Sequence, residues 1–149
     1  MKKVLFSLFA LGLVSMLSFN SCNKANTSTS EPVAGTATIK GVIKADINLD
    51  GTDETVPAGT KVIAQINAVD LIDNPTPGYN YGKIQYETTT SSIGEYSISV
   101  AAGTKSVSVN LICDDIIAGS AAFPRIILTG PTASASVVKN NVQIIDMNY

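Results

Sequence analysis

The sequence predicts an all-β domain over residues 36–149, a seven-stranded antiparallel two-sheet sandwich. Three observations predict it. Apolar and polar residues alternate in short runs throughout this region, and Gly, Pro, Asn and Asp separate the runs. No run after residue 35 has the 3.6-residue period of an amphipathic helix. We therefore expect one domain with one hydrophobic core.

The predicted strands follow from this alternation. In chain order they span residues 36–47, 61–69, 83–89, 95–100, 105–113, 123–129 and 142–149. In the first, Ala37, Ile39 and Ile43 share a face opposite Thr and Lys residues, as in a half-buried strand. Pro124 cannot donate a ladder hydrogen bond, so the sixth strand begins after it or lies at an edge. Apolar residues on both faces of the seventh predict a central strand.

The first 21 residues have the pattern of a secretory signal peptide. Lys2 and Lys3 precede an apolar run from Val4 to Phe19. This run is slightly short for a membrane span of roughly 20 apolar residues, and no basic stop-transfer cluster follows it. No Ala-x-Ala sequence precedes a cleavage site, which disfavours cleavage by the ordinary signal peptidase.

Residues 19–22, Phe-Asn-Ser-Cys, resemble the lipobox of bacterial lipoproteins, with Phe19 where Leu is usual. The resemblance implies that Cys22 is diacylated, palmitate being a typical chain, and becomes the mature N-terminus. Residues 22–35 then form a polar, Ser/Thr-rich tether. The implied location is the cell envelope of a Gram-negative bacterium, at the outer membrane. Glu31 is the only acid in the tether, which favours the periplasmic side over the cell surface.

Charge and cysteine content restrict the class of binding partner and the role of Cys113. Removal of Lys2 and Lys3 with the signal peptide changes the net charge from −2 to about −4. An acidic chain gives no reason to expect nucleic acid as a partner. The chain has two cysteines, so a lipidated Cys22 leaves Cys113 without an intrachain disulfide partner. We interpret Cys113 as a small buried apolar side chain at the end of a strand, a reactive thiol being the alternative.

Two stretches carry a family resemblance. Residues 94–109, with Gly94, Tyr96 and Gly103, resemble the central hairpin of carboxypeptidase regulatory-like or transthyretin-like domains. Residues 37–43, with Gly41 in a strand, resemble their first strand. The resemblance covers about residues 36–113 and implies a prealbumin-like, immunoglobulin-like sandwich with an accessory role in folding support, adhesion or docking. The Cys, Trp, Cys signature of antibody domains is missing, because the chain has no Trp.

The residue inventory restricts catalysis. The chain has no His, which removes Ser/His/Asp and Cys/His machinery and most zinc sites. A carboxylate-based hydrolase would need paired acids in one cleft, and the available acids are Asp70, Asp73, Asp114 and Asp115. Acidic residues that follow strand ends usually lie in solvated turns, so we expect no enzymatic activity.

The loop before the third predicted strand is a candidate contact surface. Pro75, Pro77 and Gly78 stiffen it, and Tyr79 and Tyr81 offer flat amphipathic rings suited to glycan or protein contact. We favour the interpretation that both rings cover the open end of the sandwich, with the contact surface as the alternative.

Residues 46–54, DINLDGTDE, resemble part of a calcium loop. An EF-hand is excluded, because its twelfth position is Pro57 rather than Glu and the flanking segments are strands. The carboxylates of Asp46, Asp50 and Asp53 with the Asn48 amide could still bind calcium. Asp-Gly with nearby Asn is also common turn chemistry, so we favour a plain turn and expect no other cofactor.

Together these observations predict a noncatalytic, lipid-anchored envelope protein whose sandwich contacts a protein or glycan through its loops. One alternative is a structural or adhesion subunit that assembles by strand addition along an exposed sheet edge. The other is the carboxylate-based hydrolase.

Overall fold

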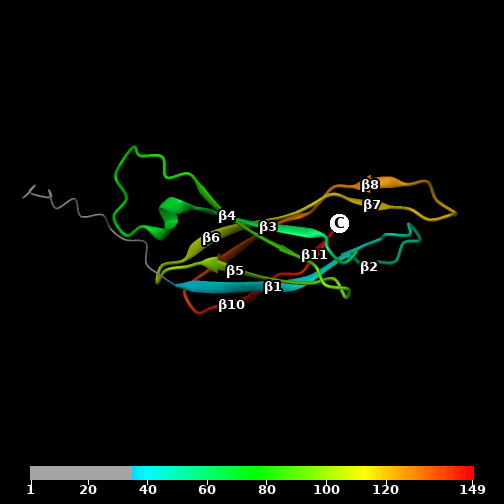
Figure 1. Cartoon of the computed structure of the whole chain (residues 1–149), viewed down its shortest axis with the longest axis horizontal. Coiled ribbons are helices and arrows are strands. Elements are labelled where there is room, and N and C mark those ends of the chain that lie inside the picture. The colour runs from blue at the N-terminus through cyan, green and yellow to red at the C-terminus, as the bar shows by residue number, and fades with distance from the viewer. Residues whose placement is uncertain (1–34) are drawn as a thin grey trace, which may run out of the picture.

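The computed structural model of the chain describes residues 35–149 (Figure 1). The predictions for the signal peptide, for lipidation at Cys22 and for the tether up to residue 34 lie outside these residues. Within the described part of the chain, no helix is long and apolar enough to cross a membrane.

Strands make up almost all of the regular structure in this part of the chain. They are β1 (Thr36–Ala45), β2 (Glu54–Thr55), β3 (Lys61–Asn67), β4 (Lys83–Thr89), β5 (Glu95–Ala101), β6 (Val107–Cys113), β7 (Ile116–Ala118), β8 (Ile126–Leu128), β9 (Thr132–Val137), β10 (Val142–Ile144) and β11 (Met147–Asn148). A single 3₁₀ turn, η1 (Ala68–Leu71), follows β3.

The first sheet is built around β1. Along one edge, β1 pairs antiparallel with β5 and then with β2; along the other, it pairs parallel with β10 and then β11. The register with β5 places Gly41 opposite Tyr96. The register with β10 places Lys40 opposite Ile144, and the same offset continues into β11, where Ile43 is opposite Met147.

The second sheet has the order β4-β3-β6-β9, and all its pairs are antiparallel. Beyond it, β7 and β8 form a separate two-stranded sheet that continues the chain path of β6 and β9 past the end of the second sheet (Figure 1). Gly130 permits the bend between these parts, because a Cβ there would lie 1.9 Å from the carbonyl oxygen of Cys113.

The two larger sheets share one hydrophobic core. Alternate residues of each long strand are buried, as the period-two pattern predicts. The largest fully buried side chains come from β1, β3, β5, β6 and β9 and from the segment after β2: Ile39, Ile43, Val56, Val62, Ile66, Val100, Val107, Val109, Leu111 and Val137. The chain is therefore all-β, and its arrangement is consistent with a β-sandwich.

Several details differ from the sequence prediction. The seven-strand count is not confirmed, because the described residues contain eleven strands, five of them only two or three residues long. The prediction of a wholly antiparallel fold is wrong, since β10 and β11 run parallel to β1. Strand pairing of this kind depends on which distant segments meet, and local alternation does not encode it.

The C-terminal third departs furthest from prediction. Residues 142–149 do not form one central strand, because they divide into β10 and β11, and Val142 and Ile144 are exposed. The predicted strand 123–129 shortens to β8, which begins after Pro124 as expected. The sequence prediction missed β9 entirely. Its residues, TASASV, are mostly small, so they lack the strong apolar alternation that identified the other strands.

Candidate functional site

The acidic loop, residues 46–53, is organised by its own side chains. Both carboxylate oxygens of Asp46 accept backbone N–H bonds, from Asp50 at 3.0 Å and from Gly51 at 2.9 Å. Asp50 in turn accepts from the N–H of Thr52 at 2.9 Å. Leu49 and Gly51 adopt positive φ angles of 62° and 91°, which turn successive N–H groups toward the carboxylates. The carboxylates therefore cap the turn.

Glu54, the last residue of the DINLDGTDE stretch and the first of β2, makes contacts with this loop that the sequence did not predict. It accepts the backbone N–H of Ile47 at 2.9 Å and the side-chain amide of Asn48 at 2.6 Å. Asp53 points elsewhere and accepts from the Asn148 amide at 3.2 Å. Over residues 35–149, no group of three or more His, Cys, Asp or Glu residues is arranged to hold a metal ion. Calcium binding stays a prediction, tested by melting the full chain with millimolar calcium and with chelator.

Asp46→Ala is expected to destabilise the domain by about 1 kcal/mol, because the N–H of Gly51 loses its carboxylate acceptor, whereas the N–H of Asp50 keeps its 2.8 Å bond to the Asn48 side-chain oxygen. Urea denaturation of the two proteins measures this difference. Asp53→Ala is the matched control, since Asp53 makes one exposed contact with Asn148. Equal midpoints for Asp46→Ala and the parent chain would show that Asp46 does not hold the turn.

The tyrosine loop, residues 72–82, lies at the opposite end of the domain from the acidic loop (Figure 1). Tyr79 and Tyr81 pack edge to face, with ring centroids 4.7 Å apart and an interplanar angle of 69°. Tyr81 is half-buried, and its hydroxyl oxygen accepts the backbone N–H of Thr76 at 2.7 Å. Tyr79 is 66% exposed. The favoured interpretation, that both rings cover the end of the sandwich, is therefore wrong for Tyr79.

This loop is tied to the rest of the domain. Lys105, in the turn between β5 and β6, forms a salt bridge of 3.1 Å with Asp73. Both side chains are partly exposed, so this ion pair contributes little to stability. It links the loop to the β5–β6 turn, whereas the Tyr79 ring is placed by its packing against Tyr81, whose hydroxyl bonds to Thr76.

The four acids considered for hydrolysis do not come together. Asp70 and Asp73 follow the end of β3 near Ile66, which is opposite Val109, whereas Asp114 follows Cys113, which is opposite Val62 at the start of β3. The two pairs of acids therefore lie at opposite ends of the second sheet. Asp73 is paired with Lys105, and Asp115 accepts the N–H of Gly130 at 2.9 Å. The carboxylate-based hydrolase gains no support from this arrangement.

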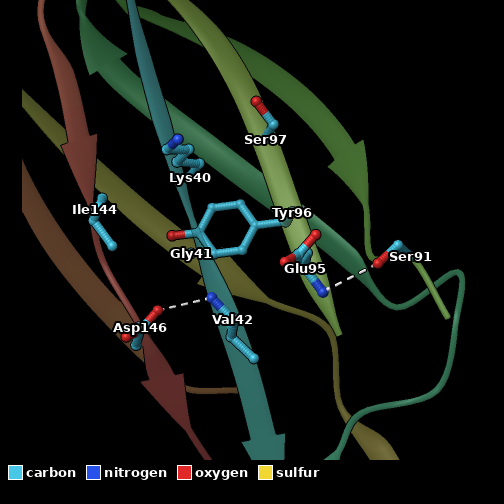
Figure 2. Close-up of a pocket in the computed structure, with 9 residues that line it drawn as sticks. All are labelled: Lys40, Gly41, Val42, Ser91, Glu95, Tyr96, Ser97, Ile144 and Asp146. Carbon is cyan, nitrogen blue, oxygen red and sulfur yellow. Dashed lines mark hydrogen bonds between the residues drawn. The ribbon is translucent and has the colours of Figure 1, made fainter. Parts of the chain in front are cut away.

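A groove on the outer face of the first sheet was not predicted. We call it the β1 groove. It consists of two adjoining hollows of about 560 and 410 Å³ that share Val42 and Asp146. Its lining residues are Lys40, Gly41, Val42, Lys44, Asp53, Ser91, Glu95, Tyr96, Ser97, Ile144, Asp146 and Asn148. In the larger hollow, Lys40 of β1, Glu95 of β5 and Asp146 between β10 and β11 line a common space (Figure 2).

The β1 groove is organised around Gly41. The Tyr96 ring reaches across β1 at Gly41, and its hydroxyl donates to the carbonyl oxygen of Ile145 at 2.8 Å (Figure 2). The next residue, Asp146, accepts the backbone N–H of Val42 at 2.8 Å through its carboxylate. In the gap between β10 and β11, the Asp146 carboxylate therefore accepts a hydrogen bond from β1, and the Ile145 carbonyl accepts one from the Tyr96 hydroxyl. A glycine within a predicted strand was the one sign of this groove in the sequence. The residues that Gly41 contacts, Tyr96 and Ile145, lie more than 50 residues away along the chain, so the sequence did not identify them.

Cys113 is buried at the end of β6, as predicted, and its sulfur lies 3.8 Å from the sulfur of Met147. Burial, with a smaller effect of the Asp114 carboxylate, raises the pKa of the Cys113 thiol to about 11. Burial also raises the pKa of Tyr96, with smaller effects from Cys113 and Asp146. Both groups are therefore protonated near neutral pH, and Cys113 is not a reactive thiolate.

Stability is expected to fall as the pH rises from about 9 to 11. The Cys113 thiol ionises near its ordinary value of 9.0 in the unfolded chain but near 11 in the folded domain, so alkali favours unfolding. The raised pKa of Tyr96 acts in the same direction. Urea midpoints across this range measure the effect. Cys113→Ala should reduce the fall, and an unchanged pH dependence in that variant would contradict this assignment.

Comparisons with known proteins add little to this description. No protein-family model matches the chain, and no curated protein matches it. Solved structures that resemble it include a candidate carbohydrate-binding protein from Pseudomonas aeruginosa, with a TM-score of 0.47 and 15% sequence identity. The match covers 82% of this chain and 93% of that protein. The fold assignment therefore rests on the strands of this chain itself.

Proposed function

We propose that this chain is a noncatalytic, lipid-anchored protein of the cell envelope. In this proposal Cys22 carries the acyl chains at the outer membrane, on the periplasmic side, and the β-sandwich contacts a protein or glycan. The signal-like residues 1–21 and the lipobox-like residues 19–22 support the anchor. The resemblance of residues 36–113 supports a prealbumin-like sandwich with an accessory role.

The exposed Tyr79 ring is the observation that carries the contact function. The Tyr79 ring is 66% exposed, and tyrosine is a preferred contact residue because it combines a large apolar surface with a polar hydroxyl. The Tyr81 ring packs against Tyr79 and bonds to the backbone of Thr76, which limits the conformational entropy that is lost when the ring binds. A flat ring with a polar hydroxyl suits both the face of a sugar and a protein surface.

A binding comparison tests this proposal. The parent chain and Tyr79→Ala are applied to arrays of envelope glycans and, separately, to isolated envelope proteins. Binding by the parent chain that Tyr79→Ala loses, with unchanged melting temperature, is the expected result. Glu87→Ala, on the exposed face of β4, is the control and should bind like the parent. Equal binding by the parent and Tyr79→Ala would contradict a role for this ring.

Strand addition is the second candidate. Within residues 35–149 the edge strand β10 pairs only with β1, and its Val142 and Ile144 side chains are 56% and 66% exposed. An unpaired edge with apolar side chains is a template for another strand. The bonds of Asn141 and Ile145 to β1 leave the N–H of Ile144 pointing to the free edge. Light scattering at rising protein concentration distinguishes this candidate, because strand addition predicts growth in mass that Ile144→Pro would prevent.

A further inference from the structure

The strands β7 and β8 and the turn between them form a projecting structure that we call the apolar arm, residues 116–128. It extends past the end of the second sheet (Figure 1). Its strands pair antiparallel, with Ile117 directly opposite Ile127. The arm has no part in the tyrosine loop or in the β1 groove, so the proposed contact function leaves it unexplained.

The two faces of the arm differ. On the inner face, Ile116 and Ala118 are buried, and the N–H of Gly119 donates to the carbonyl oxygen of Ile47 at 2.7 Å. On the outer face, Ile117 and Ile127 are 61% and 70% exposed. Phe123, at the turn, is also exposed. The inner contacts hold the arm in place, while the outer face and the tip present apolar side chains to the surroundings.

The arm also differs in charge from the rest of the chain. Residues 116–128 contain no acidic residue, and their only charged residue is Arg125. The whole chain, in contrast, has a net charge of −2. The arm is therefore an apolar, weakly basic element on an acidic protein.

We propose that the outer face and tip of the apolar arm insert into the interfacial region of a lipid bilayer. A few side chains on a two-stranded arm cannot supply the roughly 800 Å² per partner that a stable protein interface buries. A bilayer imposes no such requirement, because apolar side chains enter it individually. Arg125 complements anionic head groups. Insertion by about 5–10 Å leaves the backbone edges of β7 and β8 in the hydrated zone.

The geometry allows an anchored domain to reach the bilayer with this arm. Cys22 and Gly35 are about 13 residues apart, a segment that spans at most roughly 45 Å when extended. β1, the longest strand, measures about 33 Å. A domain tethered at the start of β1 can therefore lie along the membrane with its arm in contact. The inference rests on the proposed anchor only for keeping the domain near the lipid.

Single-tryptophan probes test the arm directly, because the chain has no Trp of its own. Phe123→Trp and Ile127→Trp are made in the full chain, purified from membranes and reconstituted into vesicles of phosphatidylethanolamine and phosphatidylglycerol. Ile144→Trp is the matched control, since Ile144 is 66% exposed on the outer face of the first sheet, the one built around β1. We expect blue-shifted emission at positions 123 and 127 that brominated acyl chains quench, and unquenched emission at 144.

Unquenched emission at both arm positions in folded protein would overturn the proposal. A blue shift that grows with protein density but resists brominated lipid would also overturn it, because it would place the arm against a second copy. Mass spectrometry of the mature N-terminus reports separately on Cys22. An unmodified Cys22 with quenched arm probes would refute the anchor alone, and a lipidated Cys22 with unquenched probes would refute the arm alone.

Discussion

Gly41→Ala is expected to destabilise the domain by about 3 kcal/mol or more, the largest effect of any small substitution considered. A Cβ at this position would lie 1.9 Å from the carbonyl oxygen of Ile145 and 3.1 Å from the Asp146 carboxylate. The first of these atoms is backbone, so no side-chain rotation relieves the overlap. Moving it would break the Tyr96 bond to Ile145 and the Asp146 bond to Val42 together. Denaturant unfolding measures the loss.

Gly78→Ala is the matched control for this effect. Gly78 has a φ of 77°, and no heavy atom lies within 4 Å of a Cβ placed there. Its substitution costs only the backbone strain of a left-handed residue, about 1 kcal/mol. If Gly41→Ala unfolds at the same denaturant concentration as Gly78→Ala, the close approach of Ile145 to β1 does not contribute to stability as described.

Cys22→Ser is expected to abolish acylation and to leave residues 1–21 attached, because the chain offers the ordinary signal peptidase no Ala-x-Ala site. A serine cannot receive a thioether-linked lipid, so the variant is held at the membrane by the apolar run from Val4 to Phe19 instead of by acyl chains. The domain itself should keep its melting temperature, because residues 35–149 form their own core. Mass spectrometry of the N-terminus measures the change, since the parent should begin at an acylated Cys22 and the variant should retain residues 1–21.

Cys113→Ala is the control that separates lipidation from general loss of a cysteine. Cys113 is buried beside Met147, so its replacement alters packing but leaves Cys22 available. This variant should begin at an acylated Cys22, like the parent. A Cys22→Ser chain whose N-terminus is processed at residue 22 like that of the parent, or a parent chain without an acyl group at Cys22, would contradict the lipoprotein assignment.

The sequence predicted those strands whose own residues alternate strongly between apolar and polar. In β3, Val62, Ala64 and Ile66 occupy every second position, so the face toward the core was evident without knowledge of the pairing. The sequence did not predict β9, because its buried positions include Ala135, a small residue that is as common in loops as in strands. The placement of β10 beside β1 depends on a parallel pairing across about 100 residues, and no local pattern reports it.

The candidate site divides in the same way. Tyr79 and Asp46 could be recognised because Pro, Gly and Asn around them mark loops. The Glu54 contacts were missed because they depend on how the loop closes, and the Asp146 contact because it joins residues about 100 positions apart. Local chemistry thus identified the loops, whereas the β1 groove and the apolar arm required the three-dimensional pairing of strands.

Photocrosslinking from position 79 in living cells tests whether the Tyr79 ring contacts a binding partner. A photoreactive phenylalanine analogue replaces Tyr79 in the full chain, and a second chain carries it at Glu87, on the exposed face of β4. We expect a discrete crosslinked product, to protein or to glycan, from position 79 and none from position 87. The absence of any product from position 79 in folded, membrane-associated protein, or the same product from both positions, would contradict it.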